Sequence, residues 1–121
     1  MRTATTKRVV LIIATLDTKS EEVIYLIERI AENDLDALVV DNGILGEPIG
    51  IVPDISASET ALAGGSTLDE ARKKGSRGEA IEIMLRGATE ITAGLFKEGR
   101  IHGAISMGGA EGGVMAAAAM Q

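Results

Sequence analysis

The sequence RVVLIIATLDTKSEE, residues 8–22, joins an unbroken apolar run to a polar turn and then to a helical pattern. The run from Val9 to Ala14 is mostly β-branched and shows no polar alternation, which is typical of a strand buried on both faces of a parallel sheet. In sheets of this kind, ligands bind at the carboxyl ends of the strands. The polar cluster Thr15–Lys19 therefore indicates where a functional site would lie.

The composition excludes several classes of function. The 121 residues allow one domain with a modest core, and the formal net charge is −6. Nucleic-acid binding needs a basic face or stacking aromatics, whereas this chain is acidic and its only aromatic residues are Tyr25 and Phe96. The chain has no cysteine and one histidine, His102, which excludes disulfides, thiolate chemistry and histidine-rich metal clusters. No segment is long enough to span a bilayer and no signal-peptide cleavage site is evident, so we expect a cytoplasmic protein.

A strand–helix–strand unit is predicted at the start of the chain. The run from Ser20 to about Asn33 carries an apolar stripe typical of an amphipathic helix, and Thr18 and Glu21 have the spacing of a capping box before it. A second short apolar strand, residues 37–40, ends at Asp41. This order predicts a βαβ unit.

The rest of the chain is predicted to hold a loop, two short helices, a long helix, a third strand and a glycine-rich turn. Their expected positions are a loop at 42–53, a helix capped by Ser56 and Glu59 and stopped at Gly64, a helical piece at 67–74, a helix at 77–98 capped by Ser76, a strand at 101–107 and the turn at 108–113. Another helix is expected to begin at Val114. The long interval 42–76 is typical of a segment packed over a site.

Gly87 and Gly94 lie one heptad apart on the predicted long helix. Each costs about 1 kcal/mol of helix propensity relative to alanine, so a compensating close approach of another backbone is expected. That backbone could belong to the same subunit or to a partner helix.

These elements predict an α/β fold, a three-layer Rossmann-like parallel sheet with helices on both faces. Three parallel strands followed by an alanine-rich helix without a stop signal make an improbable complete domain. We therefore expect residues 1–121 to be the N-terminal part of a longer protein.

The turn after the first strand is the first candidate site. Hydroxyls and backbone N–H groups at a helix N-terminus suit an anion, so Thr15, Thr18 and Lys19 are candidate phosphate ligands. Asp17 could bind a ribose hydroxyl or hydrated Mg²⁺. The alternative is that Thr18 only caps the helix and Asp17 only closes the turn. No Walker A pattern is present.

Two further turns could contribute to the same site. Asp41 stands where dinucleotide-binding folds place their ribose-binding acid, although Asp41-Asn42-Gly43 is also a common turn sequence. Gly108, Gly109 and Gly112, in GGAEGG, could let the backbone approach phosphates, or could form an ordinary turn. No Ser-His-Asp set or pair of catalytic carboxylates can be assembled, so catalytic residues stay unknown and no protein-only metal cluster is predicted.

Five segments together resemble one family, the Tm-1-like ATP-binding proteins, also described as the uncharacterised family UPF0261. They are VVLIIATLDTKSEE, VVDNGILGEP, PDIS, GSRGEAI and EGRIHGAISMGG, in matching order from about Lys7 to Met120.

The resemblance implies an N-terminal α/β domain that binds ATP, with Mg²⁺, followed by a C-terminal TIM-barrel-like domain, and it implies a homodimer. By resemblance, the nucleotide would be lined by Thr15, Asp17, Thr18, Lys19, the turn Asp41–Gly43 and the loop Gly108–Gly113. Relatives carry hydroxyl residues in that glycine loop, whereas this chain has Ala110 and Glu111 there.

Three functions remain open from the sequence. The leading hypothesis is an ATP-binding module of a larger protein, with the ligand at the carboxyl edge of the sheet. The second is part of an enzyme that uses ATP or a phosphorylated metabolite. The third is a protein–protein interaction domain stabilised by nucleotide. No membrane or nucleic-acid partner is expected.

Overall fold

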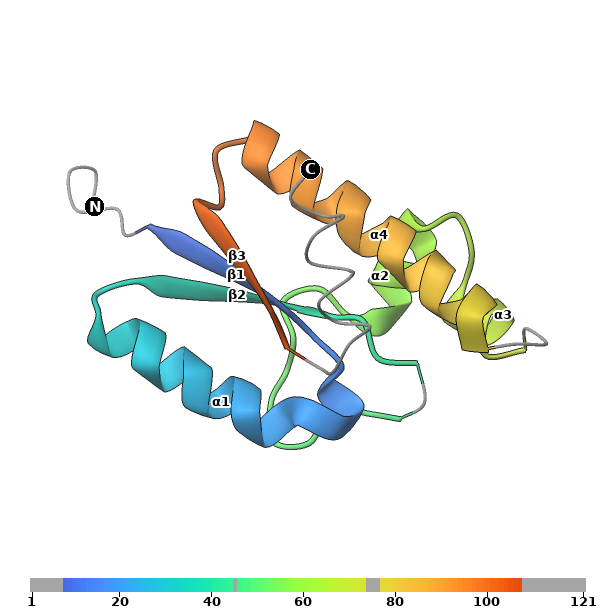
Figure 1. The fold of residues 1–121 in the computed structure, drawn as a ribbon, viewed down its shortest axis with the longest axis horizontal. Helices are drawn as coiled ribbons and strands as arrows, with labels where there is room; N and C mark the ends of the chain where they lie inside the picture. Colours follow the sequence, from blue (N-terminus) through green and yellow to red (C-terminus); the bar gives the residue numbers. More distant parts are fainter. Residues whose placement is uncertain (1–7, 45, 74–76, 108–121) are drawn as a thin grey trace.

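A parallel β-sheet forms the centre of the computed structural model, which describes residues 8–44, 46–73 and 77–107 (Figure 1). Strand β1 (Val9–Ala14) lies between β2 (Asp36–Asp41) and β3 (Gly103–Met107), and both pairings are parallel. The register pairs Ala14 with Asp41 on one side and with Met107 on the other. All three strands therefore end in line, and we call the end of the sheet after Ala14, Asp41 and Met107 the carboxyl edge.

Helices cover both faces of this sheet, as Figure 1 shows: α1 (Leu16–Glu32) lies on one face and α4 (Arg77–Lys97) on the other. Two short helices, α2 (Ala57–Ala63) and α3 (Leu68–Arg72), pack beside α4. Successive residues of β1 join opposite clusters: Leu11 and Ile13 pack with residues of α4, and Ile12 and Ala14 with residues of α1. All four are fully buried, which confirms the predicted three-layer α/β architecture.

The predicted strands are confirmed with small changes of boundary. The first has the predicted limits, and β2 is one residue longer at each end. The third was expected from Ile101 but begins at Gly103, because Ile101 is buried ahead of the ladder as part of the core on the α4 side. His102 is structural, since its Nδ1 accepts a hydrogen bond from the Val9 N–H at 3.0 Å.

The predicted start of the first helix is wrong. Helix α1 begins at Leu16 rather than near Ser20, with Thr15 as its N-cap, and Lys19 has non-helical dihedral angles (φ −119°, ψ 17°) that kink the helix after its first turn. Thr18 lies inside that first turn and is not the N-cap. The physical reason lies in β2: the first N–H of the helix, on Leu16, is accepted by the side chain of Asp41 rather than by a local cap.

The loop after β2 returns to the outer edge of that strand. Ile55 forms a parallel bridge with Val40, and the Asp54 carboxylate accepts the Val39 N–H at 2.7 Å. Ser56 then caps α2 as predicted: its hydroxyl accepts the Glu59 N–H, and the Glu59 side chain accepts the Ser56 N–H. The segment 42–53 is therefore anchored at both ends.

Ser56→Ala is expected to lower the free energy of unfolding by about 1 kcal/mol, because the substitution removes the hydroxyl that accepts the Glu59 N–H and keeps only the bond from the backbone N–H of residue 56 to the Glu59 side chain. Urea denaturation would measure the change. Ser58→Ala, an exposed serine of the same helix, is the matched control and should be close to neutral. Equal effects of the two substitutions would contradict the cap assignment.

Helices α2 and α4 meet backbone to backbone at Gly64 and Gly87. A Cβ atom placed on Gly87 would lie 1.9 Å from the Thr60 carbonyl oxygen, and one on Gly64 would lie 2.2 Å from the Ile83 carbonyl oxygen. The sequence left open whether the backbone that approaches Gly87 belongs to the same subunit or to a partner. It belongs to α2 of the same subunit. No described residue approaches Gly94 to within 4 Å of such an atom.

Three predicted elements, the cap at Ser76, the turn at 108–113 and the helix from Val114, lie outside the described residues. Among the helices that are described, none has both the length and the apolar character that crossing a bilayer requires.

Candidate functional site at the carboxyl edge of the sheet

Two threonines stand side by side where β1 passes into α1. The hydroxyls of Thr15 and Thr18 are 3.1 Å apart, and the Thr18 hydroxyl also reaches the Thr15 carbonyl at 3.3 Å. That carbonyl accepts the N–H groups of Thr18 and Lys19 as well. The backbone donors of these two residues are therefore used inside the turn, while the hydroxyl pair lies at the surface.

Asp41 is buried at the end of β2 and joins three segments. Its Oδ1 accepts the Gly43 N–H at 2.8 Å, which closes the turn Asp41–Gly43, and the Leu16 N–H at 3.2 Å, which caps α1. Its own carbonyl accepts the Thr60 hydroxyl at 2.9 Å, which ties α2 to the same point. Asp41 therefore has the turn role that the sequence offered as the alternative to ligand binding, and it also caps α1.

Asp17 approaches the same turn from the first turn of α1. A Cβ atom at Gly43 would lie 2.8 Å from Asp17 Oδ1 and 3.1 Å from Asp41 Oδ1. The two carboxylates therefore lie close to the α-carbon of Gly43, where an added side chain would require the Asp17 carboxylate to move. Asp17, Asp41 and Gly43, which the sequence placed on two separate turns, converge at the carboxyl edge.

The electrostatics of this edge are dominated by negative charge. Burial raises the pKa of Asp41 above its ordinary value, and the neighbouring charges of Asp17 and Glu47 raise it further. The N–H groups of Gly43 and Leu16 act in the opposite direction but do not cancel the effect of burial. A carboxylate that already caps α1 also occupies the helix end that would otherwise attract an anion.

Lys19 supplies positive charge at the kink of α1, two residues after Asp17. Its Nζ lies 3.7 Å from Glu22 Oε2, and its side chain is 39% exposed. Exposed ion pairs of this kind contribute at most about 1 kcal/mol, so the ammonium group can exchange Glu22 for another anion at little cost.

Of the other predicted site residues, Gly108, Gly109 and Gly112 lie outside the described residues. Three further residues hold the edge or the loop that follows it, and of these the prediction from sequence included only Asn42, within the turn Asp41–Gly43. Thr60 anchors Asp41 from α2, Asn42 is buried and donates its N–H to the Ala14 carbonyl at 3.0 Å, and Arg72 donates from Nε to the Ile44 carbonyl. Only Asn42 had a local signal, as the middle residue of Asp-Asn-Gly; the other two contacts span 19 and 28 residues.

The described side chains at this edge offer carboxylate and hydroxyl oxygens together with the ammonium group of Lys19. Within 8–44, 46–73 and 77–107, no three His, Cys, Asp or Glu side chains are grouped so that they could hold a metal ion between them. A divalent ion here would therefore need oxygens from a ligand in addition to those of the protein. Mg²⁺ is commonly held in that way, by one or two carboxylates together with phosphates.

Comparison with known proteins places the chain in a family. Residues 8–121 match the model of the N-terminal domain of the uncharacterised protein family UPF0261. A UPF0261 protein of Clostridium tetani (strain Massachusetts / E88) is 39% identical over 112 residues, which cover 93% of this chain and 28% of the relative. UPF0261 proteins of Brucella suis biovar 1 and Brucella melitensis biotype 1 are 33% and 32% identical over 103 residues, or 85% of this chain and 24% of each relative.

This chain thus spans about a quarter of the length of these relatives. The family match covers every described strand and helix, including the carboxyl edge. The chain therefore belongs to the uncharacterised protein family UPF0261 and corresponds to its N-terminal domain.

Proposed function

We propose that this domain binds a nucleotide, ATP with Mg²⁺, at the carboxyl edge of the sheet. The observation that carries the proposal is the strand order β2-β1-β3. The chain leaves β1 toward β2 on one side and later places β3 on the other, so the direction of winding reverses at β1. In open parallel sheets, ligands bind outside the carboxyl ends of the strands at this reversal.

The residues at that point suit the polar parts of a nucleotide. The hydroxyls of Thr15 and Thr18 can donate to phosphate or ribose oxygens, and the ammonium group of Lys19 can neutralise phosphate charge. The resemblance to Tm-1-like ATP-binding proteins supports the choice of ATP among nucleotides.

Mg²⁺ fits the donor set through Asp17. Asp17 and Asp41 flank the same glycine, so the edge carries excess negative charge that a divalent cation would offset. When bound, Mg²⁺ would supply charge neutralisation for the phosphates. Asp41 has a different role, because its contacts with Leu16 and Gly43 hold the turn and the helix that present Asp17 and the threonines.

The N-terminus of α1 is not proposed as the main phosphate site. Its Leu16 N–H is bound to Asp41, and the Thr18 and Lys19 N–H groups are bound to the Thr15 carbonyl. Phosphate charge would instead be met by Lys19 and by the cation. The experiments below therefore test Lys19 and Mg²⁺.

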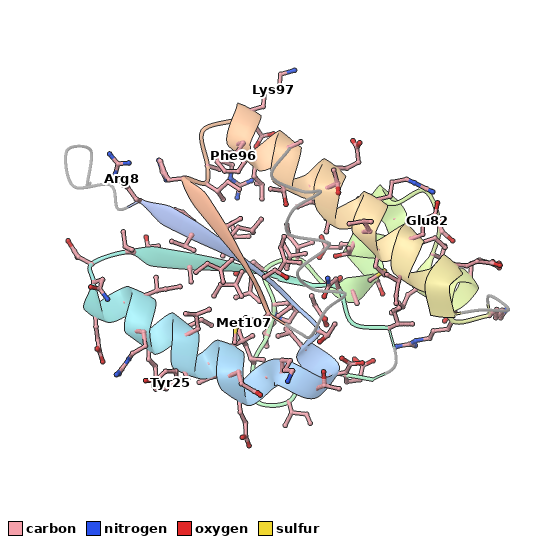
Figure 2. All side chains as sticks on the ribbon, in the orientation of Figure 1. Arg8, Tyr25, Glu82, Phe96, Lys97 and Met107 are labelled. Atoms are coloured by element: carbon pink, nitrogen blue, oxygen red, sulfur yellow. The ribbon has the colours of Figure 1, made fainter. Side chains whose placement is uncertain are left out.

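Titration calorimetry of the chain with Mg-ATP is expected to show binding that Lys19→Ala weakens about tenfold, the loss of one charge-assisted contact. Lys97→Ala is the matched control, because Lys97 lies in the last turn of α4, far from Met107 at the carboxyl edge in Figure 2. It should bind like the unmodified chain. Absence of binding, or equal affinity of the two lysine variants, would refute the site.

The role of Asp17 is tested in the same experiment with and without the cation. Asp17→Ala should bind Mg-ATP and metal-free ATP with similar affinity, whereas the unmodified chain should prefer Mg-ATP. A variant that keeps the full preference for Mg-ATP would remove Asp17 from the proposed cation site.

A further inference from the structure

A hollow lies where the loop after β2 meets α2 and α3. Its volume is about 380 Å³. Glu47 of the loop forms one wall, and Ser58 and Leu62 of α2 form another. Six of the seven lining residues are exposed, so the hollow is open to solvent. Its volume lies near the lower end of the range for ligand pockets, roughly 300–1,000 Å³, which suits a small molecule.

The remaining wall comes from α3 and its cap, Thr67, Leu68, Asp69 and Arg72. Arg72 is held in place from outside its own helix. Its Nε donates to the Ile44 carbonyl, and its Nη2 lies 3.9 Å from Glu47 Oε2. These contacts use one of the five N–H donors of the guanidinium group and orient its plane, which leaves donors for a carboxylate.

The charges that line the hollow have a mixed pattern. One cation, Arg72, faces a space that also has two carboxylates, Glu47 and Asp69. An anion would be attracted by Arg72 and repelled by Glu47 and Asp69. A cation would be repelled by Arg72 and attracted by the two carboxylates. A molecule with one group of each sign can pair with both kinds of residue.

The apolar part of the lining consists of two leucines, Leu62 and Leu68. Leu62 is 63% exposed, although it sits on a helix whose other apolar residues are largely buried. Leu68 is partly buried against the α2–α4 cluster. Exposed leucine at the wall of a hollow provides a surface for an aliphatic group. The hydroxyls of Ser58 and Thr67 add neutral hydrogen-bonding capacity, and the Thr67 hydroxyl also caps α3 by accepting the Glu70 N–H.

We propose that this hollow binds a free aliphatic α-amino acid, with its carboxylate at Arg72, its ammonium group toward Glu47 and Asp69, and its side chain on Leu62. The inference does not rest on the nucleotide site, because none of the residues proposed to contact ATP lines the hollow, although the charge of Glu47 also acts on Asp41. An effector or a substrate bound here would lie on the loop that leads from Asp41 and Gly43.

Binding can be tested by calorimetry of the chain with three probes: leucine, leucinamide and N-acetyl-leucine. Leucine is expected to bind, and each derivative, which lacks one of the two charges, is expected to bind about tenfold more weakly. Equal binding of leucine and either derivative would overturn the assignment of that charge. No heat or chemical-shift change with leucine at millimolar concentration would overturn the site.

Variants locate the binding without disturbing the core. Leu62→Glu places a charge in the hollow and should abolish leucine binding, while Val52→Glu, at a residue that is 89% exposed and outside the hollow, should leave it unchanged. Arg72→Gln keeps a donor for the Ile44 carbonyl but removes the charge, so it should bind leucine and leucinamide equally. Unchanged discrimination in Arg72→Gln, or equal binding by the two glutamate variants, would contradict the proposal.

Discussion

Gly87→Ala is expected to lower the free energy of unfolding by about 3 kcal/mol, at the upper end of overpacking effects, because the new methyl group meets backbone and not a flexible side chain. It would lie 1.9 Å from the Thr60 carbonyl oxygen and 3.1 Å from the Gly64 nitrogen. Helices α2 and α4 would have to separate. The cluster between them, which includes Ala61 and Met84, would then lose its packing.

Gly94→Ala is the matched control, on the same helix and one heptad away. No described residue lies within 4 Å of its added carbon, so the substitution should raise the free energy of unfolding by about 1 kcal/mol through helix propensity alone. Urea denaturation of both variants should therefore give changes of opposite sign. Two stabilising substitutions would show that α2 and α4 do not meet at Gly87.

The effect at Gly87 should extend to the carboxyl edge. Thr60, whose carbonyl faces Gly87, donates its hydroxyl to the Asp41 carbonyl at 2.9 Å. A shift of α2 therefore moves a partner of Asp41. Gly87→Ala should weaken Mg-ATP binding in the proposed site, whereas Gly94→Ala should leave it unchanged.

The central strand could be predicted from the sequence because its local pattern alone determines it. Val9–Ala14 is apolar at every position, and no other arrangement buries both faces of such a run as well as a parallel sheet covered on both sides. The same local logic placed the cap of α2, since Ser56 and Glu59 satisfy each other within one turn. Features satisfied within a few residues were therefore predictable.

Features that depend on contacts between residues far apart in the sequence could not be predicted. The start of α1 depends on Asp41, 25 residues away in sequence, so the Thr18–Glu21 spacing predicted the wrong cap. Arg72 reaches the Ile44 carbonyl across 28 residues, a contact that no local pattern indicates. Gly87 and Gly94 are indistinguishable in the sequence, and only packing separates them.

Asp41→Ala is expected to lower the free energy of unfolding by about 3 kcal/mol. The substitution removes the acceptor of two buried donors, the Leu16 and Gly43 N–H groups, and each unsatisfied group costs about 1–3 kcal/mol. Relief from burying a charge beside Asp17 offsets part of that cost. The loss should also weaken Mg-ATP binding, because the turn that presents Asp17 would no longer be held.

Asp41→Asn separates the hydrogen bonds from the charge. An asparagine Oδ1 can accept both N–H groups, so this variant should stay within about 1 kcal/mol of the unmodified chain near pH 4. Urea denaturation of the alanine and asparagine variants measures the difference. If both lose the same stability, the carboxylate oxygen is not the acceptor that holds Leu16 and Gly43.

The pH dependence of that comparison follows from the raised pKa of Asp41. A carboxyl group whose pKa is raised by folding stabilises the fold while it is protonated, and this contribution is lost as the pH rises from the unfolded-state pKa through the folded one. The unmodified chain should therefore lose stability relative to Asp41→Asn as the pH rises above about 4. Measured with EDTA and without nucleotide, the difference in free energy of unfolding should grow in favour of Asp41→Asn and then level off. A difference that does not change with pH, or that grows in favour of aspartate, would mean that hydrogen bonds to the carboxylate outweigh its burial, and Asp41 would then be a stabilising charge at the start of α1.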